Sequence, residues 1–217
     1  MSVLFLDLFQ SRIVRVVSIC LYLVLYLFNA QKVKKVILLF LLLCLSDYFD
    51  VYYNIPEYVK AYTVTKIFAY VVLFWLIKNK IKLFGKDIKI NFLFGLIVVL
   101  NLVIGYGAVY NYSSGIVDNI EFCLLLIYGL VIVLLAVFSA NYYFRYNSKR
   151  GLYFMSFIFG LVFADMSGFF ANYVNMDEFF YVERAFYFSA LLYFTFYLFL
   201  TKEEDDVLIF GDEEVFN

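Results

Sequence analysis

The sequence contains no histidine, one proline and three cysteines among its 217 residues. Without histidine, the chain lacks the commonest general base, the histidine of a conventional serine triad and the usual ligand of zinc and haem. The cysteines, Cys20, Cys44 and Cys123, each lie in an apolar run, which favours small apolar side chains over a disulfide or metal framework. We therefore expect no metal site and no cofactor.

Charged residues are also scarce. They make up 16% of the chain, whereas 65% of the residues are hydrophobic and 23% are aromatic. The mean hydropathy is +0.88, well above that of a soluble domain, which is nearer half apolar. The formal net charge of −1 provides no basic surface for nucleic acid. The composition thus excludes a soluble enzyme and a nucleic-acid binder, and it predicts a protein partly solvated by lipid.

Seven apolar stretches, the first of them short, resemble membrane-spanning helices, which need roughly 20 residues each. They do not alternate as the strands of a membrane barrel would. We predict an all-α polytopic transmembrane bundle of seven spans, with six or eight as alternatives, over residues 1–202, followed by an acidic cytoplasmic tail, residues 203–217. The predicted spans are Val16–Phe28, Val36–Tyr53, Tyr58–Ile77, Ile90–Tyr110, Phe122–Phe144, Gly151–Asn175 and Tyr181–Leu200.

Basic residues gather in alternate loops. The loops after the first, third and fifth spans carry lysine and arginine, whereas the loops after the second, fourth and sixth are acidic or nearly uncharged. This positive-inside pattern predicts a cytoplasmic C-terminus and an outer N-terminus, with Arg12 and Arg15 as a local exception. A helical bundle, as opposed to a barrel, favours the inner (cytoplasmic) membrane of a bacterium.

Six charged residues are predicted to lie at one depth in the outer half of the membrane. A rise of about 1.5 Å per residue puts each of them about 16–21 Å from the cytoplasmic side of a core about 30 Å thick. Charges at such a depth are costly and are rarely left without a partner or a purpose. The six residues are Asp47, Asp50, Lys66, Asp165, Glu183 and Arg184.

Two interpretations of this layer stay open. The residues line a functional cavity in which surplus carboxylates serve chemistry or ion handling, or they are structural ion pairs that hold the helices together. Asp50 and Glu183 are also near enough to the outer interface to be solvated. Two deeper tyrosines, Tyr128 and Tyr193, either donate a hydrogen bond into the cavity or simply pack.

Two segments resemble the motifs of the YhhN-like lysoplasmalogenase family. LLLCLSDYFDVYY (Leu41–Tyr53) is similar to the carboxylate-bearing helix of that family, which usually has Gly before the Asp. GLVFADMSGFFANY (Gly160–Tyr173) is similar to the second motif, which usually has Ser before the Asp. Ser46 and Ala164 occupy these two places here. The resemblance extends over most of Val36–Leu200.

This resemblance implies an integral membrane hydrolase that cleaves the vinyl ether bond of lysoplasmalogens, with membrane lipids and a lysophospholipid-like substrate as its partners. One protonated and one ionised carboxyl can deliver a proton to carbon and add water, and we predict Asp47 and Asp165 as that catalytic pair. Lys66 or Arg184 would hold the lipid phosphate or serve as a counter-ion. Two alternatives stay open: a non-catalytic lipid- or partner-binding protein, and an ion-coupled transporter, which the scarcity of Pro and Gly breaks disfavours. The sequence predicts no oligomeric state.

Overall fold

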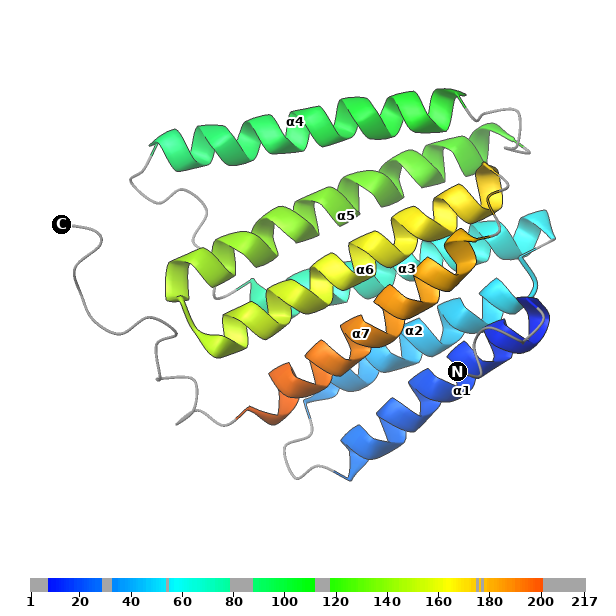
Figure 1. The fold of residues 1–217 in the computed structure, drawn as a ribbon, viewed down its shortest axis with the longest axis horizontal. Helices are drawn as coiled ribbons and strands as arrows, with labels where there is room; N and C mark the ends of the chain where they lie inside the picture. The colour runs from blue at the N-terminus through cyan, green and yellow to red at the C-terminus, as the bar shows by residue number, and fades with distance from the viewer. Residues whose placement is uncertain are drawn as a thin grey trace.

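The computed structural model describes residues 8–28, 33–53, 55–78, 88–111, 118–174, 176 and 178–200. Within these ranges the chain forms seven α-helices and no β-strand (Figure 1), which confirms the predicted all-α class and the number of helices. The predicted acidic tail lies outside the described residues. The helices are α1 (Leu8–Leu27), α2 (Lys34–Val51), α3 (Pro56–Ile77), α4 (Ile88–Asn111), α5 (Asn119–Tyr146), α6 (Lys149–Tyr173) and α7 (Phe179–Phe199).

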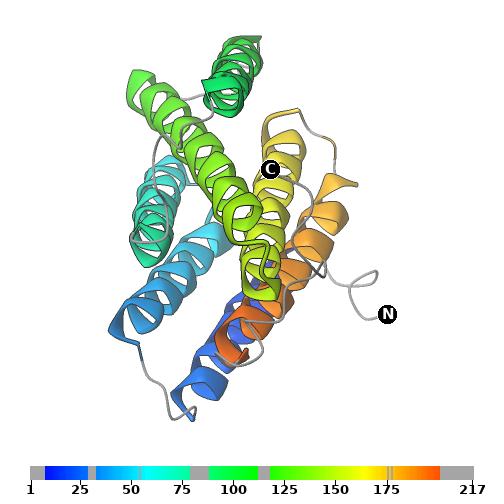
Figure 2. The same ribbon diagram turned by 90° about the vertical axis from the view of Figure 1, so that its left-hand side faces the viewer.

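The helices form one bundle in which neighbours along the chain run in opposite directions (Figures 1 and 2). The α6–α7 pair has the most extensive contact, and α2 with α3, α3 with α5, α5 with α6 and α1 with α2 complete the bundle. α4 packs against α5 at one edge, while α1 lies at the opposite edge beside α2 (Figure 1). Three helices, α3, α5 and α6, are long and apolar enough to cross a membrane.

Local sequence explains where several helices begin. Pro56 is the first residue of α3, where its missing N–H leaves no hydrogen bond unmade. Asp118 precedes α5 and accepts a hydrogen bond of 2.8 Å from the backbone N–H of Glu121, and Ser148 caps α6 in the same way. Asn147 adopts the left-handed conformation with φ 42°, so that α5 turns into α6 within two residues.

Small residues on α6 allow α7 to approach closely. Gly160, Ala164 and Gly168 recur every four residues and therefore share one face of α6. A Cβ atom at Gly160 would lie 2.9 Å from the Cβ of Ala190, and one at Gly168 would lie 3.3 Å from the carboxyl carbon of Glu183. This small-residue face is a common device for packing helices in a membrane.

The centre of the bundle is apolar and aromatic, and so is much of its surface. Leu43, Leu73 and Phe157 are fully buried, and the ring of Phe157 stacks on that of Phe194 with centroids 4.4 Å apart. On the outside, large apolar side chains such as Phe92 and Phe144 are 72% and 70% exposed. A water-soluble monomer rarely exposes apolar surface on this scale.

The described charges divide between the two ends of the bundle. All eight described acidic residues lie in the half that holds the start of α1 and the end of α2, which we call the acidic half: Asp47, Asp50, Glu57, Asp118, Glu121, Asp165, Glu178 and Glu183. The opposite end, called the basic end, has six basic residues with described side chains and no described acidic residue. These are Lys34, Lys35, Lys78, Arg145, Lys149 and Arg150.

The first helix begins earlier than the sequence predicts. α1 starts at Leu8, eight residues before the predicted start at Val16, so Arg12 and Arg15 lie inside the helix. Arg15 is buried, with 3% of its surface exposed, because α2 and α7 supply carboxylates around it. The two arginines are therefore bundle charges and do not count as loop charges in the positive-inside pattern.

Candidate functional site

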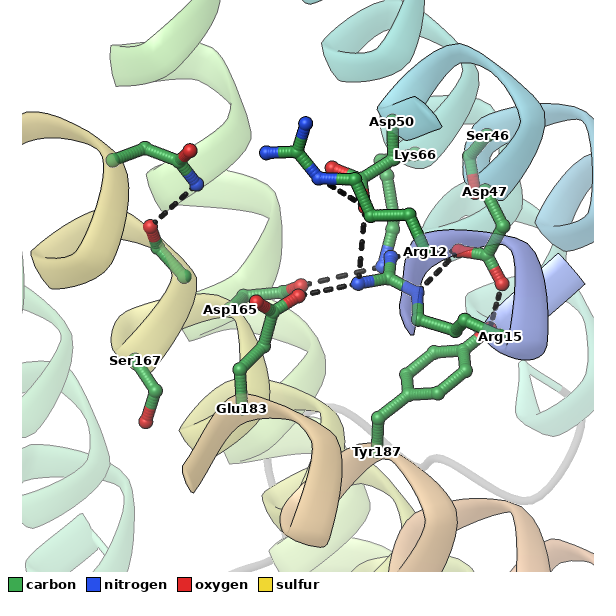
Figure 3. Close-up of polar contacts among 12 residues, drawn as sticks. Arg12, Arg15, Ser46, Asp47, Asp50, Lys66, Asp165, Ser167, Glu183 and Tyr187 are labelled. Carbon is green, nitrogen blue, oxygen red and sulfur yellow. Dashed lines mark hydrogen bonds and ion pairs between the residues drawn. The ribbon is translucent and has the colours of Figure 1, made fainter. Parts of the chain in front are cut away.

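Arg15 of α1 is surrounded by three carboxylates from two other helices (Figure 3). Its Nε and Nη2 donate to Oδ1 of Asp47 at 2.9 and 2.7 Å. Its Nη1 donates to Oε1 of Glu183 and lies 3.5 Å from Oδ2 of Asp50. A planar guanidinium can serve several carboxylates at once, which a lysine ammonium does less well. Arg15 thereby joins α1 to both α2 and α7.

Asp47 is fully enclosed by this arrangement. Its second oxygen, Oδ2, accepts a hydrogen bond of 2.6 Å from the Tyr187 hydroxyl, and its side chain has 0% exposure. The guanidinium of Arg15 also lies 4.6 Å from the centroid of the Tyr187 ring, within the range of a cation–π contact. Both carboxylate oxygens of Asp47 are thus occupied by protein donors.

Asp165 of α6 belongs to a second group in the same half. Its Oδ1 lies 3.3 Å from Nζ of Lys66, and its Oδ2 accepts a hydrogen bond from the Tyr70 hydroxyl. Lys66 is itself fully buried, and its ammonium lies 5.4–5.9 Å from the ring centroids of three tyrosines: Tyr62, Tyr70 and Tyr187. Tyr187 therefore borders both the Arg15 group and the Lys66 group.

We call these two groups together the charged cluster, consisting of Arg12, Arg15, Asp47, Asp50, Lys66, Asp165 and Glu183. The structure brings together five of the six charged residues predicted to share a layer. Arg184 is the exception: it is buried over the ring of Tyr181, with 5.8 Å to the centroid, and makes no ion pair with a described residue.

The two predicted tyrosines lie in different places. The Tyr128 ring stacks on that of Tyr70, with centroids 5.7 Å apart and an angle of 8° between them. Its hydroxyl is buried and makes no hydrogen bond with a described residue. Tyr128 borders the Asp165 group because its ring stacks on Tyr70, which donates to Asp165. Tyr193 is 38% exposed and stacks on Tyr153, away from the charged cluster.

Sequence reasoning missed Arg15, Tyr70 and Tyr187. Arg12 and Arg15 are three residues apart, as Asp47 and Asp50 are, and in antiparallel helices Arg12 pairs with Asp50 while Arg15 pairs with Asp47. This matched spacing was a usable signal. Tyr70 and Tyr187 each follow a buried charge, Lys66 and Glu183, by four residues and so share its helix face.

An apolar cavity of about 180 Å³ lies between α3 and α5, and Asp165 is not among its lining residues. Its lining includes Phe74, Leu135 and Tyr70, the tyrosine whose hydroxyl donates to Asp165. Tyr70 thus joins the cavity to the charged cluster. The cavity is smaller than the about 300–1,000 Å³ of a usual ligand site, so it has room for part of an apolar chain.

A smaller polar network lies at the extreme of the acidic half. Lys60 donates to Asp118 ahead of α5, and the Tyr173 hydroxyl donates to Oε1 of Glu121 at 2.7 Å. The hydrogen bonds from Lys60 and from the backbone N–H of Glu121 lower the pKa of the Asp118 carboxyl below its usual value. This network fastens α3 to the start of α5.

The cysteines form no disulfide within the described chain. Cys20 of α1 and Cys44 of α2 approach to 3.6 Å between sulfur atoms, well beyond the disulfide bond length of about 2.05 Å, and Cys123 is separate. No group of three His, Cys, Asp or Glu side chains among the described residues could hold a metal ion.

No model of a known protein family, no curated protein and no solved structure matches this chain. We therefore infer the function from the residues and geometry of the charged cluster and its neighbouring cavity.

Proposed function

We propose that this chain is an integral membrane hydrolase whose seven helices all cross the bilayer and which cleaves the vinyl ether bond of a lysoplasmalogen-type lipid. The observation that carries the proposal is the position of Asp165. It lies between Lys66 and Tyr70, and Tyr70 lines an apolar cavity between two helices. The YhhN-like resemblance of the sequence supplies the substrate class.

The burial of charge supports seven spans. α1, α2 and α7 carry charged residues that lower their hydropathy, but Arg15, Asp47 and Glu183 are buried inside the bundle, with at most 9% of each exposed. Such residues do not meet lipid, so the outer surface of these helices remains apolar. The basic end faces the cytoplasm in this proposal, together with the C-terminus.

The two predicted catalytic carboxylates have different surroundings, and we assign them different roles. Each carboxylate has a partner on both oxygens, Arg15 and Tyr187 for Asp47, and Lys66 and Tyr70 for Asp165. We assign Asp47 the role of positioning Arg15. Asp165 borders the cavity through Tyr70, so it takes part in proton transfer, with Lys66 as its counter-ion. This refines the predicted pair into one reacting carboxyl and one positioning carboxyl.

The reaction needs few groups. A proton adds to the vinyl carbon remote from oxygen, water adds to the resulting oxocarbenium carbon, and the hemiacetal separates into an aldehyde and an alcohol. In its protonated form Asp165, with the Tyr70 hydroxyl bonded to it, is placed to deliver the proton to carbon, and as the resulting carboxylate beside Lys66 it takes one back from water. General acid–base catalysis of this kind contributes about 10²–10⁴-fold in rate. The apolar cavity would hold the hydrocarbon chain.

Aldehyde release from a lysoplasmalogen by the detergent-solubilised protein tests the proposal. We expect turnover by the wild type, a loss of at least about 10²-fold in Asp165→Asn, and a smaller loss in Tyr70→Phe. Tyr193→Phe is the matched control, because Tyr193 lies away from the charged cluster, and it should keep full activity. Folded wild-type protein without aldehyde release, or an active Asp165→Asn variant, would contradict the proposal.

A second candidate is a lipid-binding protein on the same scaffold without turnover. It is favoured by one observation: every carboxylate of the charged cluster has a cationic partner within 4.0 Å, so the ion pairs alone account for their burial. Binding of a lysoplasmalogen to folded protein without any aldehyde would support this candidate over the hydrolase.

A further inference from the structure

An apolar cavity lies at the basic end of the described bundle, far from the charged cluster. It has a volume of about 320 Å³ and lies between α1, α2 and α7. Its walls are aromatic and aliphatic, with Tyr26, Phe40 and Leu198 among them, and Thr195 as the one small hydroxyl. Ligand sites usually occupy about 300–1,000 Å³ and are lined in this way.

The cavity exists because α1 is joined to α7 at one end only. In the acidic half, Arg15 links α1 to Glu183 of α7. Toward the basic end, α1 follows α2, and Phe40 of α2 forms ring contacts with Tyr26 at 5.9 Å and Phe194 at 5.7 Å. Phe40 therefore forms a floor between α1 and α7, and the space above it opens between them.

The start of α2, which carries Lys34 and Lys35, adjoins Tyr26 of the cavity wall. The Tyr26 hydroxyl accepts a hydrogen bond of 2.8 Å from the backbone N–H of Val33, the residue that precedes α2. Lys34, the next residue, is exposed and makes no ion pair with a described residue, whereas Lys35 is held over the Trp75 ring at 4.1 Å. The first turn of α2 has no acidic side chain and no side-chain cap.

Two lysines in the first turn of α2 lie at the positive end of the helix dipole, where anions are favoured and cations are disfavoured. A phosphate group there would be favoured by Lys34 and by the positive end of the helix dipole. A hydrocarbon chain attached to that phosphate would meet the apolar cavity beside Tyr26. The start of α2 and the apolar cavity are therefore suited to the phosphate and the hydrocarbon chain of one lipid molecule.

We propose that the cavity between α1, α2 and α7 binds one acyl chain of an anionic phospholipid, with the lipid phosphate at Lys34. This inference depends on the proposed position of the helices in a bilayer, but it does not depend on the hydrolase activity, which belongs to the charged cluster. The bound lipid fills the space between α1 and α7 and stabilises the bundle at its basic end.

Delipidated, detergent-solubilised protein allows a direct test by native mass spectrometry and by the unfolding temperature. The probes are phosphatidylglycerol, phosphatidylcholine with the same acyl chains, and inorganic phosphate. We expect phosphatidylglycerol to bind more tightly than phosphatidylcholine and to raise the unfolding temperature more. Inorganic phosphate should give little shift, because it has no chain to fill the cavity.

Two variants separate the phosphate from the chain. Lys34→Gln should lower the affinity for phosphatidylglycerol about fivefold, the effect of one lysine at an anionic lipid surface, and lower that for phosphatidylcholine less, because the choline cation offsets the charge of its phosphate. Thr195→Phe fills the cavity and should lower the affinity for both lipids. The substitution breaks no link between helices, because the Thr195 hydroxyl donates to Leu191 O of its own helix. The matched controls are Lys149→Gln, at the same end, and Leu192→Phe, one turn earlier on the exposed face of α7.

The outcomes are distinct from those of the aldehyde assay. Equal affinity for the two lipids, an effect of Lys149→Gln as large as that of Lys34→Gln, or a shift from phosphate alone as large as from phosphatidylglycerol would each overturn this proposal. Asp165→Asn should bind phosphatidylglycerol as the wild type does. A protein that binds the anionic lipid but releases no aldehyde would therefore refute the hydrolase alone.

Discussion

The acidic half and the basic end of the bundle use charge in opposite ways. In the acidic half, carboxylates and cations face one another inside the protein and join helices that are distant in sequence, as Arg15 joins Asp47 and Glu183. At the basic end, lysines such as Lys34 and Lys149 are exposed, and aromatic side chains hold the helices together. Basic side chains therefore hold helices together in the acidic half, whereas at the basic end they remain available to an anion from outside the protein.

The largest expected effect comes from removing the central cation of the acidic half. Arg15→Met leaves the carboxylates of Asp47 and Glu183 buried without a cationic partner. Breaking such a buried pair costs about 3–5 kcal/mol of folding stability. Lys34→Met, at the basic end, should change the stability of delipidated protein by less than about 0.5 kcal/mol. Unfolding followed by circular dichroism in one detergent measures both. Comparable effects of the two substitutions would remove the distinction between the ends.

Two glycines on α6 give a finer comparison, because the same helix face meets an apolar neighbour and a carboxylate. Gly160→Ala puts a methyl 2.9 Å from the Ala190 methyl, and overpacking of this kind costs about 1–3 kcal/mol. Gly168→Ala meets the end of the Glu183 side chain at 3.3 Å, which can shift, so we expect a smaller loss.

Gly129→Ala is the matched control for this pair, because nothing lies within 4 Å of its added Cβ. It should be neutral or gain up to about 1 kcal/mol of helix propensity. Thermal unfolding of the three variants in parallel would rank them. A Gly160→Ala variant as stable as Gly129→Ala would mean that α6 and α7 are farther apart than the structure indicates.

The smallest expected effect is the pH dependence of the Lys60–Asp118 pair at the extreme of the acidic half. The pKa of Asp118 is lower in the folded chain than its usual value, so the ionised carboxyl stabilises the fold above the unfolded pKa, about 4. This contribution is lost as the pH falls through the lowered pKa. Asp118→Asn, which keeps a capping oxygen, should therefore lower the unfolding temperature slightly at pH 7, with a difference that vanishes at low pH.

Lys60→Gln should reproduce this small loss at pH 7, and the double variant should add nothing further, because one interaction has been removed twice. Glu57→Gln, on an exposed neighbour in the first turn of α3, is the control. If the effect of Asp118→Asn were the same at every pH, the ion pair would not be its source.

Seven helices and their approximate limits could be predicted from the sequence because apolar runs of about 20 residues have few other stable forms. Counting residues along those runs also brought Asp47, Lys66 and Asp165 to similar depth, since the rise of a helix is constant. The start of α1 was wrong by eight residues, because Arg12 and Arg15 resemble charges that flank a span. Within the described bundle they face carboxylates that only other helices supply.

Apart from the matched spacing of Arg12 and Arg15 with Asp50 and Asp47, the choice of partners could not be predicted, because it depends on the rotation of each helix about its axis. Arg184 and Glu183 are adjacent in sequence and therefore point to different sides of α7, so only Glu183 reaches Arg15. Tyr187, four residues after Glu183, shares its face, whereas Tyr193 points outward. A helix that is apolar on all sides gives no sequence signal for which face points inward. Counting depth along the helices therefore predicted which charged residues share a layer, but it did not predict which of them pair.

The burial of Arg15 has a consequence for biosynthesis. α1 leaves the ribosome before α2 and α7: Asp47, the first strong partner of Arg15, follows 32 residues later, whereas Glu183 follows 168 residues later. At about 5–20 residues per second, the second partner is made roughly 10–30 s after the first helix. In the proposed seven-span arrangement, α1 would therefore enter the membrane most readily as a hairpin with α2, with Arg15 already paired to Asp47 before Glu183 is made.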